Sequence, residues 1–107
     1  MGAVVWVNAV DWGPHEATSS EARAALGMLK DRARVVYERT GKVPRDFAEL
    51  GVGEDELLGT YYKPANYIIV GGTPECWSAV CTGVYESQPK HLIVTADLVS
   101  GKASFNR

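Results

Sequence analysis

The sequence predicts an α+β fold in which a long N-terminal helix packs on a three- to four-stranded antiparallel sheet. Residues 17–40 carry apolar side chains at three- and four-residue spacing, which places them on one face of a helix. Residues 66–105 contain short β-branched runs separated by glycine, proline and asparagine, a pattern typical of strands joined by tight turns. Because the helical and strand patterns are segregated along the chain, we expect neighbouring strands to pair antiparallel.

The predicted helix has an apolar stripe and a well-marked end. Gly41 stands where a left-handed C-cap residue is commonly needed, and Pro44 prevents the helix from continuing. We expect the helix to begin near residues 16–18, with Thr18 as N-cap and Glu21 as its partner in a capping box. The stripe expected to face the sheet consists of Ala22, Ala25, Leu26, Leu29, Ala33, Val36 and Tyr37.

Short elements follow the helix. Residues 45–51 are long enough for about one and a half helical turns, and the acidic residues of 54–59 favour one further turn. Residues 71–74 are interpreted as a plain turn. The segments expected as strands are residues 67–70, 77–85, 91–97 and 102–105.

The residues around the end of the helix form a specific string, Tyr-x3-Gly-x2-Pro-x2-Phe-x2-Leu. It comprises Tyr37, Gly41, Pro44, Phe47 and Leu50. This string resembles the soluble part of type IV pilins and of the related pseudopilins of type II secretion, in which a helix ends in a Tyr…Gly-x-x-Pro pattern and a loop leads to an antiparallel sheet. The resemblance is specific over residues 21–50. It implies that these five residues are determinants of a pilin-like fold.

The resemblance also implies a function. It indicates a structural subunit, not an enzyme, that works without catalytic residues, cofactor or metal. Such subunits are cleaved by a prepilin peptidase, carry a methylated N-terminus and assemble into a filament. The implied partners are copies of the chain and other pilins, the inner-membrane assembly machinery, and the membrane through an N-terminal helix missing from this sequence. The implied location is the inner membrane before assembly and a periplasmic or extracellular filament afterwards.

Residues 1–15 admit two interpretations, whereas residues 16–107 are expected to form the globular domain. The apolar run at the start is far shorter than the roughly 20 residues needed to span a bilayer. The resemblance implies the remnant of a longer apolar helix, and the alternative is a separate, flexible arm. Trp6 and Trp12 could pack on a neighbouring molecule or on the core of the same molecule, and the sequence leaves both open.

Cys76 and Cys81 carry the only covalent chemistry that the sequence indicates. Their Cys-x4-Cys spacing is not the Cys-x-x-Cys redox motif, and the distant His15 and His91 do not complete a zinc site. A disulfide and two reduced thiols remain, and we expect the disulfide. In a straight strand the two α-carbons would lie about 17 Å apart, whereas a bridge needs about 5.5 Å. The disulfide therefore requires a turn between them, and it implies an oxidising compartment.

Three other functional classes stay open, and an enzyme is the least favoured of them. No nucleotide, hydrolase or metalloprotease motif is found, and a net charge of −2 gives no general attraction to nucleic acid. A minor pilin could still bind DNA or a surface ligand through a basic and aromatic patch, for which exposed Trp77 beside Lys90 and Lys102 is the expected place. The other alternative is a small cytosolic α+β regulatory protein.

In the pilin interpretation, the Cys76–Cys81 loop and the turn at residues 85–89 form the outer surface.

Overall fold

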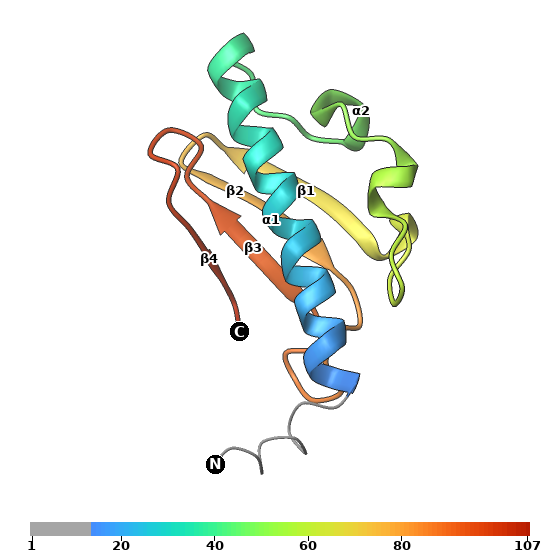
Figure 1. The fold of residues 1–107 in the computed structure, drawn as a ribbon. Coiled ribbons are helices and arrows are strands. Elements are labelled where there is room, and N and C mark those ends of the chain that lie inside the picture. The colour runs from blue at the N-terminus through green and yellow to red at the C-terminus, as the bar shows by residue number, and fades with distance from the viewer. Residues whose placement is uncertain (1–13) are drawn as a thin grey trace, which may run out of the picture.

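The computed structural model describes the backbone of residues 14–107 and the side chains of residues 18–107. Helix α1, Pro14–Thr40, lies across one face of a four-stranded antiparallel sheet (Figure 1). The predicted α+β fold is therefore confirmed. The predictions for residues 1–13, including the packing of Trp6 and Trp12, concern a segment outside the described residues. The other elements are α2 Phe47–Leu50, the 3₁₀ turns η2 Glu54–Leu57 and η3 Pro64–Asn66, and the strands β1 Tyr67–Thr73, β2 Cys76–Cys81, β3 Leu92–Ala96 and β4 Ala103–Phe105.

Helix α1 begins earlier than predicted and ends where predicted. It starts at Pro14, so Thr18 and Glu21 lie inside the helix and the predicted capping box is wrong. Proline suits the first position of a helix, because the N–H that it lacks would have no partner there. At the other end Gly41 has φ +73°, and its N–H donates to the carbonyl oxygen of Tyr37 at 2.8 Å.

The predicted apolar stripe is the face that packs on the sheet. Its central members, Ala22, Leu26, Leu29 and Ala33, are completely buried. Ala25 and Tyr37 are partly buried against the same core, and Val36 is half-buried at the margin. The interaction of α1 with the sheet is made with β2 and β3.

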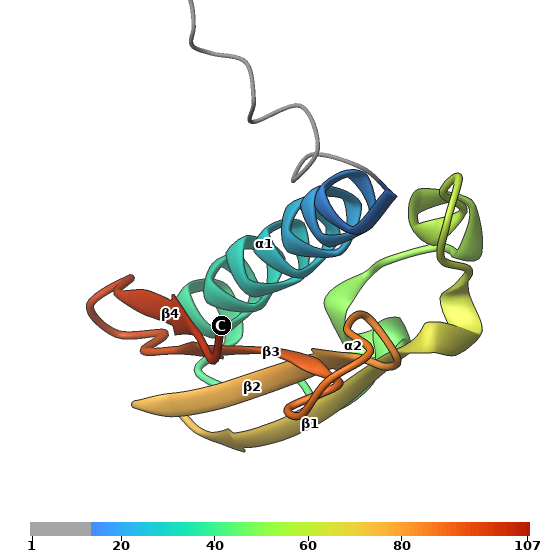
Figure 2. The same cartoon turned by 90° about the horizontal axis from the view of Figure 1, so that it is seen from below.

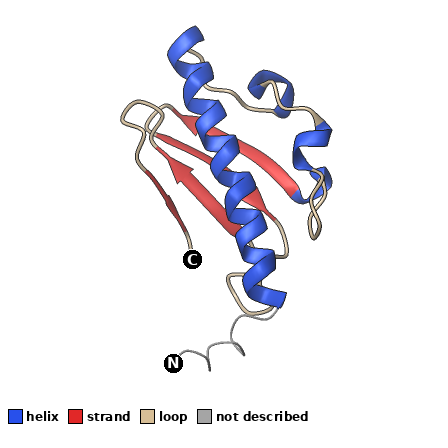
Figure 3. Cartoon of the chain, in the orientation of Figure 1, coloured by secondary structure: helices blue, strands red, loops and turns tan. Residues whose placement is uncertain are grey.

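The sheet is a simple meander in the order β1-β2-β3-β4, with α1 on one face only (Figures 2 and 3). Side chains alternate along each strand, so that Trp77, Ala79 and Cys81 of β2 point toward the helix and are fully buried. Trp77 pairs with Ala96 of β3, and Cys81 pairs with Leu92. The layer between helix and sheet is therefore the hydrophobic core.

Strand boundaries depart from the prediction at the first hairpin. β1 continues through Gly71 and Gly72, which were expected in a turn, with a bulge between Ile69 and Gly71. β2 ends at Cys81 and does not reach residue 85. A bulge inserts one extra residue into a strand without ending the pairing, and glycine tolerates the local backbone geometry.

The connection from α1 to the sheet is held by a few specific contacts. Asp46 caps α2 by accepting the N–H of Glu49 at 2.8 Å, and Gly51 ends α2 with φ +72°. Pro44 is buried, and its carbonyl oxygen accepts the indole N–H of Trp77 at 2.8 Å. This hydrogen bond ties the connection directly to the centre of the sheet.

The burial of the stripe leads to a stability prediction for Leu29→Ala. We expect the free energy of unfolding to fall by about 2–5 kcal/mol, because a completely buried leucine leaves a cavity when truncated. Val35→Ala on the same helix is the control, since Val35 is 41% exposed, and it should change stability by less than about 1 kcal/mol. Urea denaturation measures both. Equal losses in the two variants would contradict the assigned packing face.

Candidate assembly surface on helix α1

The side of α1 that does not face the sheet carries an apolar groove. Two adjoining hollows, which share Ala24 and Met28, run along this side of the helix. The first, of about 280 Å³, is closed on its far side by Leu57 and Leu58, and Leu58 is 61% exposed. We call the two hollows together the α1 groove; its helical lining is Glu21, Ala24, Ala25, Gly27, Met28, Asp31, Arg32 and Val35.

Glu21 joins α1 to the loop that borders the groove. Its carboxylate accepts the backbone N–H groups of Thr60, Tyr61 and Tyr62 at 2.9, 2.9 and 2.8 Å. Gly59 lies so close that a Cβ there would overlap the same carboxylate. The glycine is therefore needed for the loop to approach the helix.

The electrostatics at Glu21 favour the ionised carboxylate. Burial is the largest single influence and raises the pKa of Glu21. The three backbone N–H donors and the nearby Lys63 act in the opposite direction, and together they lower the pKa below its usual value of 4.5. The charged form is therefore the one that holds the loop.

Arginine side chains fasten the other segments to α1. Arg32 donates to the carbonyl oxygen of Gly51 at 2.9 Å and to the carboxylate of Glu56 at 2.7 Å. Glu56 in turn accepts the N–H of Gly53 at 3.1 Å. These contacts fix the segment containing η2 as the wall of the α1 groove.

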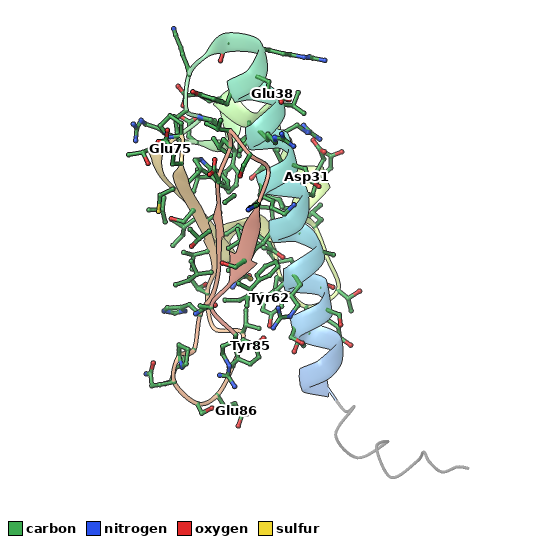
Figure 4. The ribbon with its side chains drawn as sticks, turned by 90° about the vertical axis from the view of Figure 1, so that its left-hand side faces the viewer. Asp31, Glu38, Tyr62, Glu75, Tyr85 and Glu86 are labelled. Carbon is green, nitrogen blue, oxygen red and sulfur yellow. The ribbon has the colours of Figure 1, made fainter. Side chains whose placement is uncertain are left out.

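A second arginine contact closes the opposite flank, near the start of α1. Arg23 donates to the Tyr85 hydroxyl at 3.2 Å and lies 5.1 Å from the centroid of the Phe105 ring. The guanidinium of Arg107 lies 3.9 Å from the centroid of the Tyr85 ring, a cation–π arrangement. Figure 4 shows Tyr85, with Glu86 beyond it, at the end of the sheet that lies nearest the start of the helix.

Comparison with known proteins returned no relative. No protein-family model, no curated protein and no solved structure matches the chain. Among the described residues no helix is both long and apolar enough to cross a membrane. Within residues 18–107, no three side chains of His, Cys, Asp or Glu lie close enough together to hold a metal ion.

The structure gathers the residues of the Tyr-x3-Gly string around a single connection. The N–H of Gly41 donates to the carbonyl oxygen of Tyr37 at the end of α1. The carbonyl oxygen of Pro44 accepts the indole N–H of Trp77 in β2. Phe47 is partly buried against the core and Leu50 is 1% exposed. All five residues therefore shape the fold. That the chain belongs to the family that this string resembles remains a prediction.

The predicted disulfide is wrong. Cys76 and Cys81 are both free, and they are the first and last residues of one continuous strand, β2. The turn that a bridge would require is absent, and about 17 Å of extended chain separates the two α-carbons. The Cys76–Cys81 segment is also not a surface loop, because Cys81 is completely buried.

The expected basic and aromatic binding patch is wrong as well. Trp77 is completely buried, and its N–H is used by the carbonyl of Pro44. Its position in β2, between two side chains that face the other way, places it on the helix side of the sheet. Trp77 cannot form a binding surface with Lys90 and Lys102.

Sequence reasoning missed the polar contacts made by Glu21, Arg23 and Arg32. Glu21 was assigned to a local capping box, although its partners lie 39 to 41 residues further along the chain. The sequence assigned no partner to the two arginines. The single local signal for these contacts is Gly59, which permits the close approach to Glu21 but does not identify it.

The Glu21 contact leads to a pH-dependent stability prediction. Glu21→Gln should lower the free energy of unfolding by about 1–3 kcal/mol at pH 7, because hydrogen bonds to a charged acceptor are lost. The folded-state pKa is lowered, so this advantage of the native protein is fully present above pH 4.5 and is lost as the pH falls through the folded-state value. Urea denaturation at pH 7 and near pH 3 measures it.

The control for this prediction is Glu38→Gln. Glu38 is exposed and lies 3.7 Å from Arg34 on the same helix. It should change stability by less than about 1 kcal/mol. The difference in free energy of unfolding between the native protein and Glu21→Gln should shrink between pH 7 and pH 3. If it does not, the charge of the Glu21 carboxylate is not what holds the loop.

The free cysteines lead to a reactivity prediction. Without reductant, an alkylating reagent should add one group rapidly to the folded protein, at exposed Cys76. Cys81 should react only on unfolding, because burial raises its pKa to about 11 despite a hydrogen bond with Tyr67 that acts in the other direction. Mass spectrometry before and after denaturation counts the added groups. If the chain takes up no reagent when it is unfolded without reductant, the two cysteines form a disulfide and this prediction is wrong.

Proposed function

We propose that the chain is a structural subunit that assembles into a filament of the type IV pilus or type II secretion kind. Helix α1 and the apolar residues ahead of it would make the contacts. The observation that carries the proposal is α1 itself, a 27-residue helix. It buries one stripe completely on the sheet, and its opposite side bears the α1 groove.

The chemistry of the α1 groove suits a second helix. Ala24 and Gly27 are small enough for a neighbouring backbone to approach closely, whereas Met28 and Val35 supply apolar area. The partners would be copies of the chain and other pilins. Contacts of this kind that do not close on themselves generate filaments. The resemblance further assigns the inner-membrane assembly machinery and the membrane as partners, and a periplasmic or extracellular location.

A second candidate function is a small α+β regulatory protein. The two free thiols favour it, because a chain that works in an oxidising compartment commonly uses its cysteine pairs as disulfides. This candidate needs neither filament assembly nor export. The cellular location of the protein therefore separates it from the first.

Sheared filaments test the proposal. In cells that express the gene, an antibody against this domain should detect the chain in the sheared surface or membrane fraction. N-terminal sequencing of the mature chain should find roughly 20 apolar residues in its first helix. A chain found only in the cytosolic fraction, and absent from filaments, would contradict the filament and favour the regulatory protein.

A matched pair of helix variants tests the role of the groove. Ala24→Lys places a charge in the α1 groove, whereas Ala48→Lys places one on exposed α2 outside it. Both alanines are exposed, so both variants should fold. We expect Ala24→Lys to reduce the chain in sheared filaments by about tenfold or more, equivalent to about 1.4 kcal/mol, and Ala48→Lys to leave it unchanged. Equal incorporation of the two variants would exclude the groove as the assembly contact.

A further inference from the structure

Tyr85 lies at the end of the sheet nearest the start of α1 (Figure 4), and two arginine side chains converge on it. Arg23 of α1 donates from Nη2 to the Tyr85 hydroxyl at 3.2 Å, and the guanidinium carbon of Arg107 lies 3.9 Å from the centroid of the Tyr85 ring. Arg23 also donates to the backbone carbonyl oxygen of Arg107. A single tyrosine side chain therefore holds both guanidinium groups close together. We call Arg23, Tyr85 and Arg107 the arginine cluster.

Both arginines of the cluster are held by further contacts. Arg107 donates from Nη1 to the carbonyl oxygens of Ser87 and Pro89 at 3.2 and 3.1 Å. The guanidinium carbon of Arg23 lies 5.1 Å from the centroid of the Phe105 ring, a second cation–π contact. The two guanidinium groups are thus positioned before any ligand arrives, and preorganisation of this kind lowers the entropy cost of binding.

Within residues 18–107, no acidic side chain balances the two positive charges of the arginine cluster. None of the ion pairs between side chains in that part of the chain involves Arg23 or Arg107. Glu86, the next residue after Tyr85, lies beyond it (Figure 4). Two like charges held close together repel each other, and an anion bound to both removes that repulsion. The arrangement therefore favours a negatively charged ligand.

The arginine cluster also has hydrogen-bond donors to spare. Arg23 uses its Nη2 and Arg107 its Nη1, and the other guanidinium nitrogens have no acceptor in the part of the chain that the structure describes. The Tyr85 hydroxyl accepts from Arg23, which leaves its own proton to be donated. Arg107 is exposed and Arg23 is half-buried, so a ligand can reach both from solvent.

We infer that the arginine cluster binds a small phosphate monoester. The oxygens of a tetrahedral phosphate point in several directions and can accept from two arginines and a tyrosine together, whereas the two oxygens of a carboxylate lie in one plane and match a single guanidinium fork. A monoester carries a charge of about −1.5 to −2 at pH 7, which is close to the opposite of the two arginine charges. A diester carries a charge of only about −1 per phosphate.

The site is separate from the surface proposed for filament assembly. Arg23 does not line either hollow of the α1 groove, and neither do Tyr85 and Arg107. A small phosphate ester could therefore occupy the arginine cluster whether or not the chain is assembled. The inference goes beyond the proposed function and does not rest on it.

NMR titration of the amide signals with glycerol 3-phosphate, at constant ionic strength, tests the inference. The amides of residues 83–91 should shift with a dissociation constant on the order of 1 mM, because the site is open to solvent and salt screens its charges. Inorganic phosphate should bind with similar affinity. Dimethyl phosphate, which is a diester, and acetate should each bind about tenfold more weakly.

Variants identify the side chains that bind. Arg23→Gln and Arg107→Gln should each weaken the binding of glycerol 3-phosphate by about tenfold or more. Arg39→Gln is the matched control, since Arg39 is exposed in the last turn of α1, at its other end. It should change the affinity by less than about twofold. Tyr85→Phe keeps the ring beneath Arg107 but removes the hydroxyl, and it should weaken binding about threefold.

Each alternative result overturns the inference. The site is excluded if no amide shifts up to about 50 mM glycerol 3-phosphate, or if Arg39→Gln weakens binding as much as Arg107→Gln. Dimethyl phosphate that binds as tightly as the monoester would assign the cluster to phosphodiesters, and acetate that does so would assign it to carboxylates. Circular dichroism checks the fold of each variant.

The conservative variant decides if an arginine variant does not fold. In that case an unchanged affinity of Tyr85→Phe for glycerol 3-phosphate excludes the site. None of these results bears on the presence of the chain in sheared filaments.

Discussion

The burial of one stripe of α1 against the inner face of the sheet is the interaction on which the rest of the structure depends. Leu26 and Leu29 from the helix and Trp77, Leu92 and Val94 from the strands are all completely buried in this layer. Each such side chain contributes on the order of 2–3 kcal/mol through apolar burial. The polar contacts at the edges, made by Arg23 and Arg32, are exposed or partly exposed and contribute less. They set where the loops lie, whereas the buried layer sets whether the chain folds.

The parts of the fold that follow from local patterns could be predicted. The three- and four-residue spacing from Ala22 onward identified the sheet-facing side of α1, and the glycine at position 41 identified its end. The boundaries of β2, which begins and ends at the two cysteines, were not predicted, because the expected disulfide required a turn between them. The alternation pattern of a strand was nevertheless present: Trp77, Ala79 and Cys81 are apolar residues at every second position. A continuous strand accounts for the apolar residue at all three positions, whereas a disulfide accounts only for the cysteine.

The polar contacts around the α1 groove lay beyond local reasoning for a physical reason. A glutamate three residues after a threonine has the same sequence pattern whether its carboxylate turns back to the helix start or reaches a distant loop. At Glu21 the distant loop offers three N–H donors where the helix start would have offered one. Which alternative wins is decided by the tertiary position of residues 60–62, and no short window of sequence contains that information. The same holds for Arg23, whose partners are 62 and 84 residues away.

Gly72, near the end of β1, has a consequence for the uniqueness of the fold. A slip of one residue between paired strands exchanges the two faces of a sheet, and here neither face carries a charge that would oppose the exchange. The opposition comes from shape. Gly72, at φ +127°, sits against the carbonyl of Cys76 so closely that no residue with a side chain could replace it. A pairing shifted one way would bring Thr73 to that position, where it would not fit, whereas the opposite shift would bring Gly71, which has no side chain to clash. Gly72 thus opposes one of the two one-residue slips, and the burial of the apolar face of the strands opposes both.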